Sequence, residues 1–297
     1  MLVWVSRRAR CIRDYTLGVM KSEFSFERIL VVGDTHTNGS WLRDVVLPSA
    51  AELEVPGIVI IGDFGYWEDG ATFLRIAREA EKTHGLSVLF LDGNHENHEL
   101  LRRDVEEFGG DLDNTRRPVW MGGGLVYLPR GSHFSVGGLD VEAFGGAASI
   151  DKGWRRAGES WFLEELITDA DLAFAAKADV MLTHDAPSGW EIPGLPSRWG
   201  MDRAWLAEIP NCEAHRLRLR EAFDVAQPSV LIHGHYHSQY NTTVYESWGA
   251  VEIVGLNRDT YPGWGAVLES RNGVAYVDQS SELLRDTVPW SLRSLDA

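Results

Sequence analysis

Residues 29–36 read Ile29-Leu-Val-Val-Gly-Asp34-Thr-His36, an apolar run closed by glycine and followed at once by two polar side chains. Four later segments also place Asp, Asn or His after an apolar run: Ile58-Val-Ile-Ile-Gly-Asp63, Val88-Leu-Phe-Leu-Asp-Gly-Asn94-His95-Glu96, Val180-Met-Leu-Thr-His184 and Val230-Leu-Ile-His-Gly-His235-Tyr-His237. Such runs predict buried strands, and ligand sites in helix-covered sheets lie beyond the carboxyl ends of strands. We therefore expect the polar residues of all five segments to meet in one place.

The residues expected there are two Asp, one Asn and four His, with His95 as an additional imidazole. Residues two apart in an extended chain point to the same side, so Asp34 with His36, and His235 with His237, can each direct two ligands at one point. Carboxylate, amide and imidazole donors suit Zn, Mn, Fe or Mg, and the chain has no cysteine cluster for a closed zinc site or an iron-sulfur cluster. Seven donors are too many for one ion, but they can hold two if a carboxylate bridges them.

The order Asp-x-His, Gly-Asp, Gly-Asn-His-Glu, a single His after a strand and Gly-His-x-His resembles that of the calcineurin-like metallophosphoesterases, from about Ile29 to about Asn257. The resemblance implies a mixed α/β fold, a two-sheet β sandwich flanked by helices. It also implies two divalent ions, one held by Asp34, His36 and His237 and the other by Asn94, His184 and His235, with Asp63 as the bridge. By the same resemblance, His95 protonates the leaving oxygen or stabilises the phosphoryl charge.

Each block alone has a simpler explanation, because a Gly-Asp pair is usually a turn and a lone His is usually a core or capping group. Five such blocks in a fixed order argue against coincidence. His233 is predicted to pack within its strand or to support the ligands, and Glu96 to anchor its turn or cap the next helix. The histidines without a motif are predicted to be ordinary surface or helix residues: His84, His98, His133 and His215.

One departure from the family bears on the substrate. In the protein serine/threonine phosphatase branch, the Gly-Asp block continues to an Asp that orients the catalytic His and to an Arg that grips the phosphate, whereas here Tyr66 and Trp67 follow. The resemblance therefore favours phosphodiesters, such as cyclic or other small nucleotides, over phosphomonoesters or phosphoproteins. Arg155 and Arg156, or Arg198 and Arg203, could replace the missing clamp or could be ordinary surface residues. Base-stacking candidates are Trp67, Trp154, Trp190 and Trp199. A catalytically silent scaffold is a further alternative, which the complete ligand set disfavours.

The formal charge of -16 disfavours broad binding of duplex nucleic acid, although two divalent metals can still attract a small anionic substrate. Cys11 and Cys212 are too few for a disulfide framework, which is typical of the cytoplasm. The chain shows neither a secretory signal nor an apolar stretch long enough for a membrane span. We expect an extension over residues 1–27, one domain over 28–280 and a tail over 281–297, with translation starting at either Met1 or Met20.

Periodicity predicts helices over residues 41–47, interrupted by Pro48, and over 71–84, 97–108, 159–176 and 213–223. Alternating runs predict antiparallel hairpins within 119–148 and antiparallel strands from Tyr240 onward. The Pro-rich and Gly-rich segment 187–199 is predicted to form a loop over the site.

Overall fold

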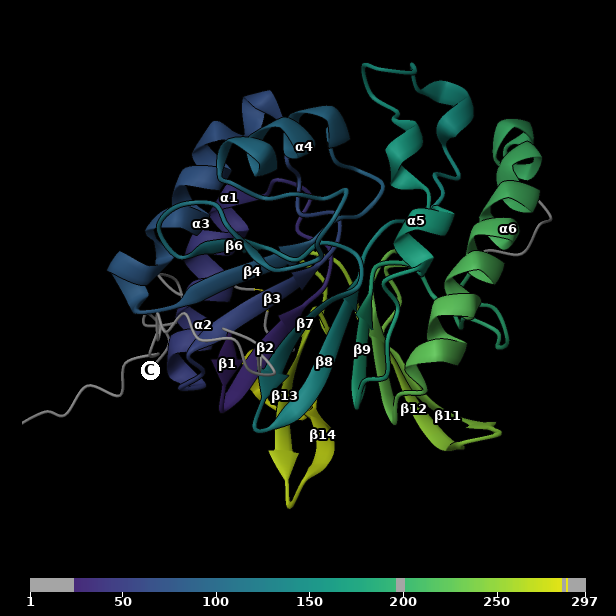
Figure 1. The fold of residues 1–297 in the computed structure, drawn as a ribbon. Coiled ribbons are helices and arrows are strands. Elements are labelled where there is room, and N and C mark those ends of the chain that lie inside the picture. The colour runs from purple at the N-terminus through teal and green to yellow at the C-terminus, as the bar shows by residue number, and fades with distance from the viewer. Residues whose placement is uncertain (1–23, 196–200, 285–286, 288–297) are drawn as a thin grey trace, which may run out of the picture.

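The computed structural model describes residues 24–195, 201–284 and 287 (Figure 1). Within these residues, two seven-stranded sheets pack together. We call sheet A the sheet with the order β1-β7-β8-β9-β10-β12-β11. Its strands are β1 (Ser25–Phe26), β7 (Ser132–Val136), β8 (Leu139–Phe144), β9 (Val180–Thr183), β10 (Val230–His233), β11 (Tyr240–Glu246) and β12 (Gly249–Gly255).

Sheet B has the order β14-β13-β2-β3-β4-β6-β5. Its strands are β2 (Arg28–Val32), β3 (Gly57–Ile61), β4 (Ser87–Leu91), β5 (Val119–Trp120), β6 (Leu125–Tyr127), β13 (Gly265–Arg271) and β14 (Val274–Asp278). The three motif-bearing strands β2, β3 and β4 run parallel, as do β9 and β10 in sheet A. The predicted hairpins are confirmed, because β5 with β6, β7 with β8, β11 with β12 and β13 with β14 pair antiparallel.

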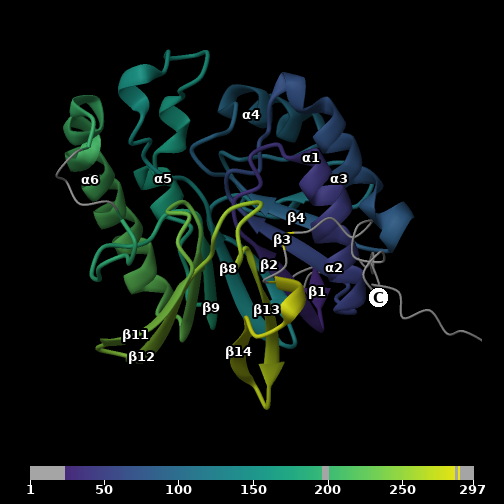
Figure 2. The same cartoon turned by 180° about the vertical axis from the view of Figure 1, so that it is seen from behind.

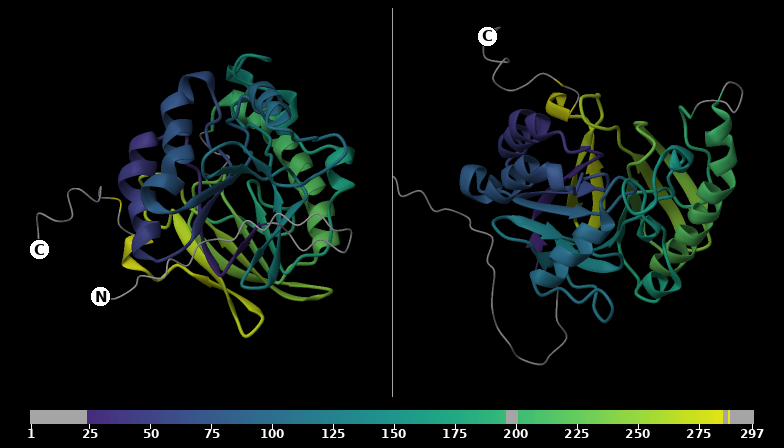
Figure 3. Two further views of the ribbon diagram at one scale, coloured as in Figure 1. Left: turned by 60° about the vertical axis from the view of Figure 1, so that its left-hand side comes forward. Right: turned by 90° about the horizontal axis from the view of Figure 1, so that it is seen from above.

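Alternation along the strands divides the core into layers. In β2, Ile29 and Val31 pack into a cluster between the two sheets, whereas Leu30 and Val32 face the helices that cover sheet B. A third cluster lies between sheet A and helix α6 (Arg203–Ala226) and includes Leu219 and Phe223. Figure 3, right, shows these helix, sheet, sheet and helix layers from above. The predicted α/β sandwich flanked by helices is confirmed.

The remaining helices are α1 (Gly39–Trp41), α2 (Leu47–Glu52), α3 (Ala71–His84), α4 (His98–Glu107) and α5 (Asp169–Leu172). Short 3-10 turns occupy Glu68–Gly70, Lys152–Trp154, Leu163–Glu165 and Glu282–Leu284. Helix α3 has its predicted bounds and buried face, and Asn97 caps α4 by accepting a hydrogen bond from the Leu100 N–H. Seen from behind, α6 lies beside the end of sheet A that holds β11 and β12 (Figure 2).

Three helix predictions were wrong in extent. The helix does not stop at Pro48, because a π turn over Leu42–Val46 leads directly into α2, whose first turn contains Pro48. The predicted helix over 159–176 is broken into a 3-10 turn and α5. There the guanidinium of Arg130 donates to the main-chain carbonyls of Glu164 and Leu166.

The third error concerns the helix predicted over residues 213–223. The observed α6 is longer, begins at the Asp202 cap and includes Pro210. Pro210 is exposed and removes a single donor, which the rest of this long helix tolerates. The predicted domain bounds stay a prediction, and most of the N-terminal extension, most of the tail and the end of the 187–199 loop lie outside the described residues.

Candidate metal centre

The polar residues that follow five strands lie together at the carboxyl ends of those strands. Sheet B supplies three of them, since Asp34, Asp63 and Asn94 follow β2, β3 and β4. Sheet A supplies the other three positions, His184 after β9 and His235 with His237 after β10. His36 lies two residues beyond Asp34. The site is therefore built jointly by both sheets.

Two groups of side chains each bring three ligand atoms within 4.8 Å of one another, which is close enough to hold a metal ion. The first group is Asp34, His36 and His237, and the second is Asp63, His184 and His235. Oδ1 of Asn94 lies 3.2 Å from Nε2 of His184, so its amide joins the second group. These are the seven residues expected from the strand ends, and they form two adjacent sets of oxygen and nitrogen donors that suit divalent ions.

The Asp63 carboxylate lies between the two groups. Its Oδ1 is 3.2 Å from Nε2 of His184, and its Oδ2 is 3.4 Å from Nε2 of His36. Oδ1 also accepts a hydrogen bond of 2.8 Å from the backbone N–H of His95. One carboxylate therefore contacts both groups and the residue proposed for proton transfer.

Four of the seven candidate ligands have left-handed backbone conformations. The φ angles are 44° at His36, 43° at Asp63, 67° at His235 and 49° at His237. Each such conformation costs roughly 1–3 kcal/mol in a non-glycine residue and is concentrated at functional sites. At Gly62, which precedes Asp63, a Cβ atom would overlap the His184 ring, so this strand end must be glycine.

Glu96 holds the turn after Asp63. Its buried carboxylate accepts hydrogen bonds from the backbone N–H groups of Phe64, Gly65 and Tyr66 at 2.8, 2.8 and 2.7 Å. Burial and the nearby Asp63 charge raise the pKa of Glu96 to about 7, although these three bonds oppose the shift. The structure thus gives Glu96 the anchoring role of the two that were predicted.

Protons on histidine balance the buried carboxylates when no metal is bound. Burial disfavours the charged form of His184, but Asp63 outweighs this effect and raises the pKa of His184 to about 10. Burial acts the same way on His36, where Asp259 and Asp63 raise the pKa to about 10. Burial by itself would raise the pKa values of Asp34 and Asp63. The histidine contacts outweigh burial, so both pKa values lie below their ordinary value. A divalent ion would replace these imidazolium charges.

Metal binding should therefore release protons. Because His36 and His184 have raised pKa values, both are protonated at neutral pH without metal, and we expect about two protons to leave as Mn²⁺ binds. Affinity should rise with pH until these pKa values are passed. Calorimetric titration in two buffers of different ionisation enthalpy measures the release. Asp259→Asn should release fewer protons, since it removes a carboxylate that supports the His36 charge, and a binding heat independent of the buffer would contradict the prediction.

His95 lies beside the two groups without joining them. Its ring centroid is 5.8 Å from that of His36. Burial lowers the pKa of His95, and the Arg155 charge lowers it further against the opposing effect of Asp63. The indole N–H of Trp67 donates a 2.7 Å hydrogen bond to the His95 carbonyl, which fixes the backbone of this residue.

Arg155 is the arginine candidate that reaches this site. Its Nη2 lies 2.7 Å from Nδ1 and 2.6 Å from Nε2 of His95, and its side chain is only 8% exposed, so the surface alternative was wrong for this residue. Arg156 is 81% exposed and pairs with Glu159, and Arg203 is exposed at the start of α6. Arg198 lies outside the described residues.

The aromatic candidates divide into packing and exposed residues. Tyr66 is fully buried and donates to Asp104, so it does not face a substrate. Trp67 packs near Phe162, and the Trp190 N–H donates to the Tyr240 hydroxyl. Trp154 is 58% exposed, whereas Trp199 lies outside the described residues.

Several supporting residues were missed from the sequence. Asp259 accepts a hydrogen bond from Asn38 and lies 3.6 Å from Nδ1 of His36. It follows β12, so the rule of polar residues after strands could have found it. Asn94 donates to the Ser149 hydroxyl, which in turn donates to Glu165. These contacts come from a loop without a recognisable motif.

The other histidines serve the fold. His233 is buried in β10, with Nε2 2.6 Å from the Tyr240 hydroxyl, as predicted for a packing residue. His98 and His215 are helix residues but not ordinary ones, because both are buried and contact the Gly93 carbonyl and Asp185, respectively. His84 is exposed at the end of α3 and His133 is partly exposed.

A helix that crosses a membrane must be long and apolar, and none of the helices in the described part of the chain meets both requirements.

The fold and site define an α/β sandwich with two adjacent groups of metal-ligand type at its strand ends. The sequence model of the calcineurin-like phosphoesterase family matches residues 27–239, and the chain belongs to this family. The resemblance inferred from the five blocks is thereby confirmed. Together, the family and the two ligand groups support metal-dependent hydrolysis of phosphoesters.

A comparison with solved structures matches this chain to two proteins of Thermus thermophilus. TT1561 is 14% identical with a TM-score of 0.47, over 85% of this chain and 98% of that protein. A hypothetical protein is 14% identical with a TM-score of 0.41, over 84% of this chain and 98% of its own. No curated protein sequence matches this chain significantly.

Proposed function

We propose that this protein hydrolyses phosphodiesters, among them cyclic or other small nucleotides, with two divalent ions. Asp34, His36 and His237 would hold one ion, Asn94, His184 and His235 the other, and Asp63 would bridge them. Mn, Fe, Zn or Mg all suit these donors. The contacts of Asp63 with both ligand groups support this assignment.

When bound, two such ions lower the pKa of a shared water and stabilise charge on the attacking and leaving oxygens. The chain adds groups that position the reactants. His95 is placed beside the ligand groups to give a proton or a hydrogen bond to the leaving oxygen. Trp67 and Arg155 hold the backbone and ring of His95.

The hydrogen bonds of the Arg155 guanidinium are the observation that supports a diester substrate. Its Nε donates to Asp151, its Nη1 to the main-chain carbonyls of Asn94 and Ser160, and its Nη2 faces His95. Every nitrogen of this guanidinium is thus engaged within the protein, and the Asp151 carboxylate balances its charge. A phosphomonoester carries one more negative charge than a diester and would need a cation to balance it. The two ions suffice for a diester.

Substrate preference tests this proposal directly. We expect a higher kcat/KM for bis-p-nitrophenyl phosphate or a cyclic nucleotide than for p-nitrophenyl phosphate, at the same metal content and pH. Asp151→Asn provides a matched comparison, because it should free the Arg155 charge and shift the ratio toward the monoester. A clear preference of the unaltered protein for p-nitrophenyl phosphate would refute the proposal.

One observation favours the alternative of a phosphomonoesterase or phosphoprotein phosphatase. Arg155 lies against His95 and could bind a phosphate by exchanging Asp151 for it. In that case Arg155→Lys, which loses the bidentate geometry, should weaken monoester turnover much more than diester turnover. The complete set of seven candidate ligand residues disfavours a catalytically silent scaffold.

A further inference from the structure

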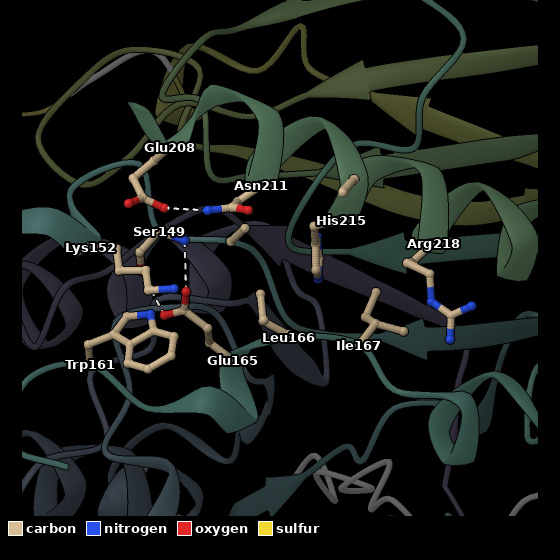
Figure 4. Close-up of a pocket in the computed structure, with 12 residues that line it drawn as sticks. Ser149, Lys152, Trp161, Glu165, Leu166, Ile167, Glu208, Asn211, His215 and Arg218 are labelled. Atoms are coloured by element: carbon tan, nitrogen blue, oxygen red, sulfur yellow. Dashed lines mark hydrogen bonds between the residues drawn. The ribbon is translucent and has the colours of Figure 1, made fainter. Parts of the chain in front are cut away.

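A cavity of about 220 Å³ lies between helix α6 and the segment 148–167 (Figure 4). Ala148, Leu166, Ile167 and Ala214 give it apolar walls. Lys152 and His215 add polar groups at separate points along the cavity, as Figure 4 shows. Its combination of apolar surface with a few polar atoms is typical of sites for small organic molecules.

His215 presents an unsatisfied acceptor to this cavity. The residue is 4% exposed, and its Nδ1 lies 2.7 Å from Oδ2 of Asp185. Because a carboxylate only accepts, Nδ1 donates its hydrogen to Asp185, and the tautomer that this bond selects has its lone pair on Nε2. Within the described residues this buried Nε2 has no hydrogen-bond partner. Buried polar atoms are nearly always paired, so a ligand with an N–H or O–H donor fits here.

Lys152 supplies the complementary donor. Its ammonium lies 4.4 Å from the centre of the Trp161 ring and forms no ion pair within the described part of the chain. A ligand that reaches it needs a carbonyl oxygen or a ring nitrogen as acceptor. Glu165 and Glu208 also line the cavity, as does Arg218, which pairs with Asp169 and Glu221, so acidic and basic residues are present in equal number. The occupant should therefore be uncharged, with one donor and one acceptor on an otherwise apolar body.

We propose that this cavity binds an uncharged nucleobase or nucleoside. Such a molecule has flat apolar faces for the walls, an N–H donor for Nε2 of His215 and a carbonyl or ring nitrogen for Lys152. The cavity is separate from the candidate metal centre, although Ser149 in its wall accepts a hydrogen bond from Asn94. The proposal does not depend on which phosphoester is hydrolysed.

Binding of four neutral nucleosides tests the proposal in the metal-loaded, full-length protein. Adenosine, guanosine, cytidine and uridine would each be titrated by calorimetry, and we expect at least one to bind with a Kd of about 1 mM or tighter. Ala214→Leu, which fills the cavity, should weaken this binding at least about tenfold. Ala207→Leu is the matched control, because Ala207 is exposed on the same helix and does not line the cavity.

A second variant separates ligand binding from folding. His215→Asn keeps a side-chain N–H for Asp185 but removes Nε2, and it should also weaken nucleoside binding while hydrolysis of bis-p-nitrophenyl phosphate confirms an intact metal centre. Absence of binding by all four nucleosides would overturn the proposal. Equal affinity in the Ala214→Leu and Ala207→Leu variants would overturn it too, since the nucleoside would then bind elsewhere.

Discussion

Asp63→Ala is expected to reduce hydrolysis to background and to empty or cripple both metal positions. The two oxygens of Asp63 lie near His184 and His36, so one truncation removes a ligand from each group. It also removes the acceptor of the His95 N–H. Metal content per chain, measured by mass spectrometry of the elements alongside turnover, gives the result.

Asp113→Ala is a suitable control for this experiment. Its carboxylate is 72% exposed and pairs with Arg102 on the surface, so metal content and turnover should not change. Two ions per chain and near-normal turnover in Asp63→Ala would show that the bridging assignment is wrong. Loss of activity with one ion retained would place Asp63 in a single group.

His95→Ala should lower kcat by about 10² to 10⁴, the usual contribution of a positioned proton donor, while both ions stay bound. The loss should be smaller for nitrophenyl leaving groups, which need little protonation, than for alkyl ones. Because the pKa of His95 is lowered, the proton-donating form is lost as pH rises. The rate with an alkyl leaving group should therefore fall as pH increases through the neutral range in the unaltered protein only.

The exposed His84 offers the matched control, and His84→Ala should keep the full rate. Metal analysis of His95→Ala separates a catalytic defect from loss of ions. Equal losses for nitrophenyl and alkyl leaving groups would argue against proton donation and would leave His95 as a group that only stabilises charge.

The strand-end pattern predicted much of the metal centre because burial of an apolar run and the position of the polar residue after it are both determined by short stretches of sequence. Apolar runs such as 58–61 must be buried, and the chain then has to emerge at a strand end with its polar residue. Parallel pairing of β2, β3 and β4 brings three such ends together. Helix α3 was equally predictable, since its buried face follows from helical spacing alone.

The supporting contacts depend on tertiary structure and could not be predicted in this way. Arg155 is indistinguishable from Arg156 in sequence, yet Asp151 and two main-chain carbonyls draw only Arg155 inward. The segment 159–176 has the composition of a helix, but its carbonyls bond to Arg130, which lies far away in the chain. Neither the burial of Arg155 nor the break in segment 159–176 can be predicted from the spacing of nearby residues.

The division of candidate ligands between two sheets has a consequence for folding. Asp34, Asp63 and Asn94 belong to one sheet and His184, His235 and His237 to the other, so each bound ion would connect the two sheets. An ion that binds the folded chain and not the unfolded one adds its binding free energy to stability. The bound ions would then cross-link the two sheets, and the Tm of the protein would rise with the concentration of metal.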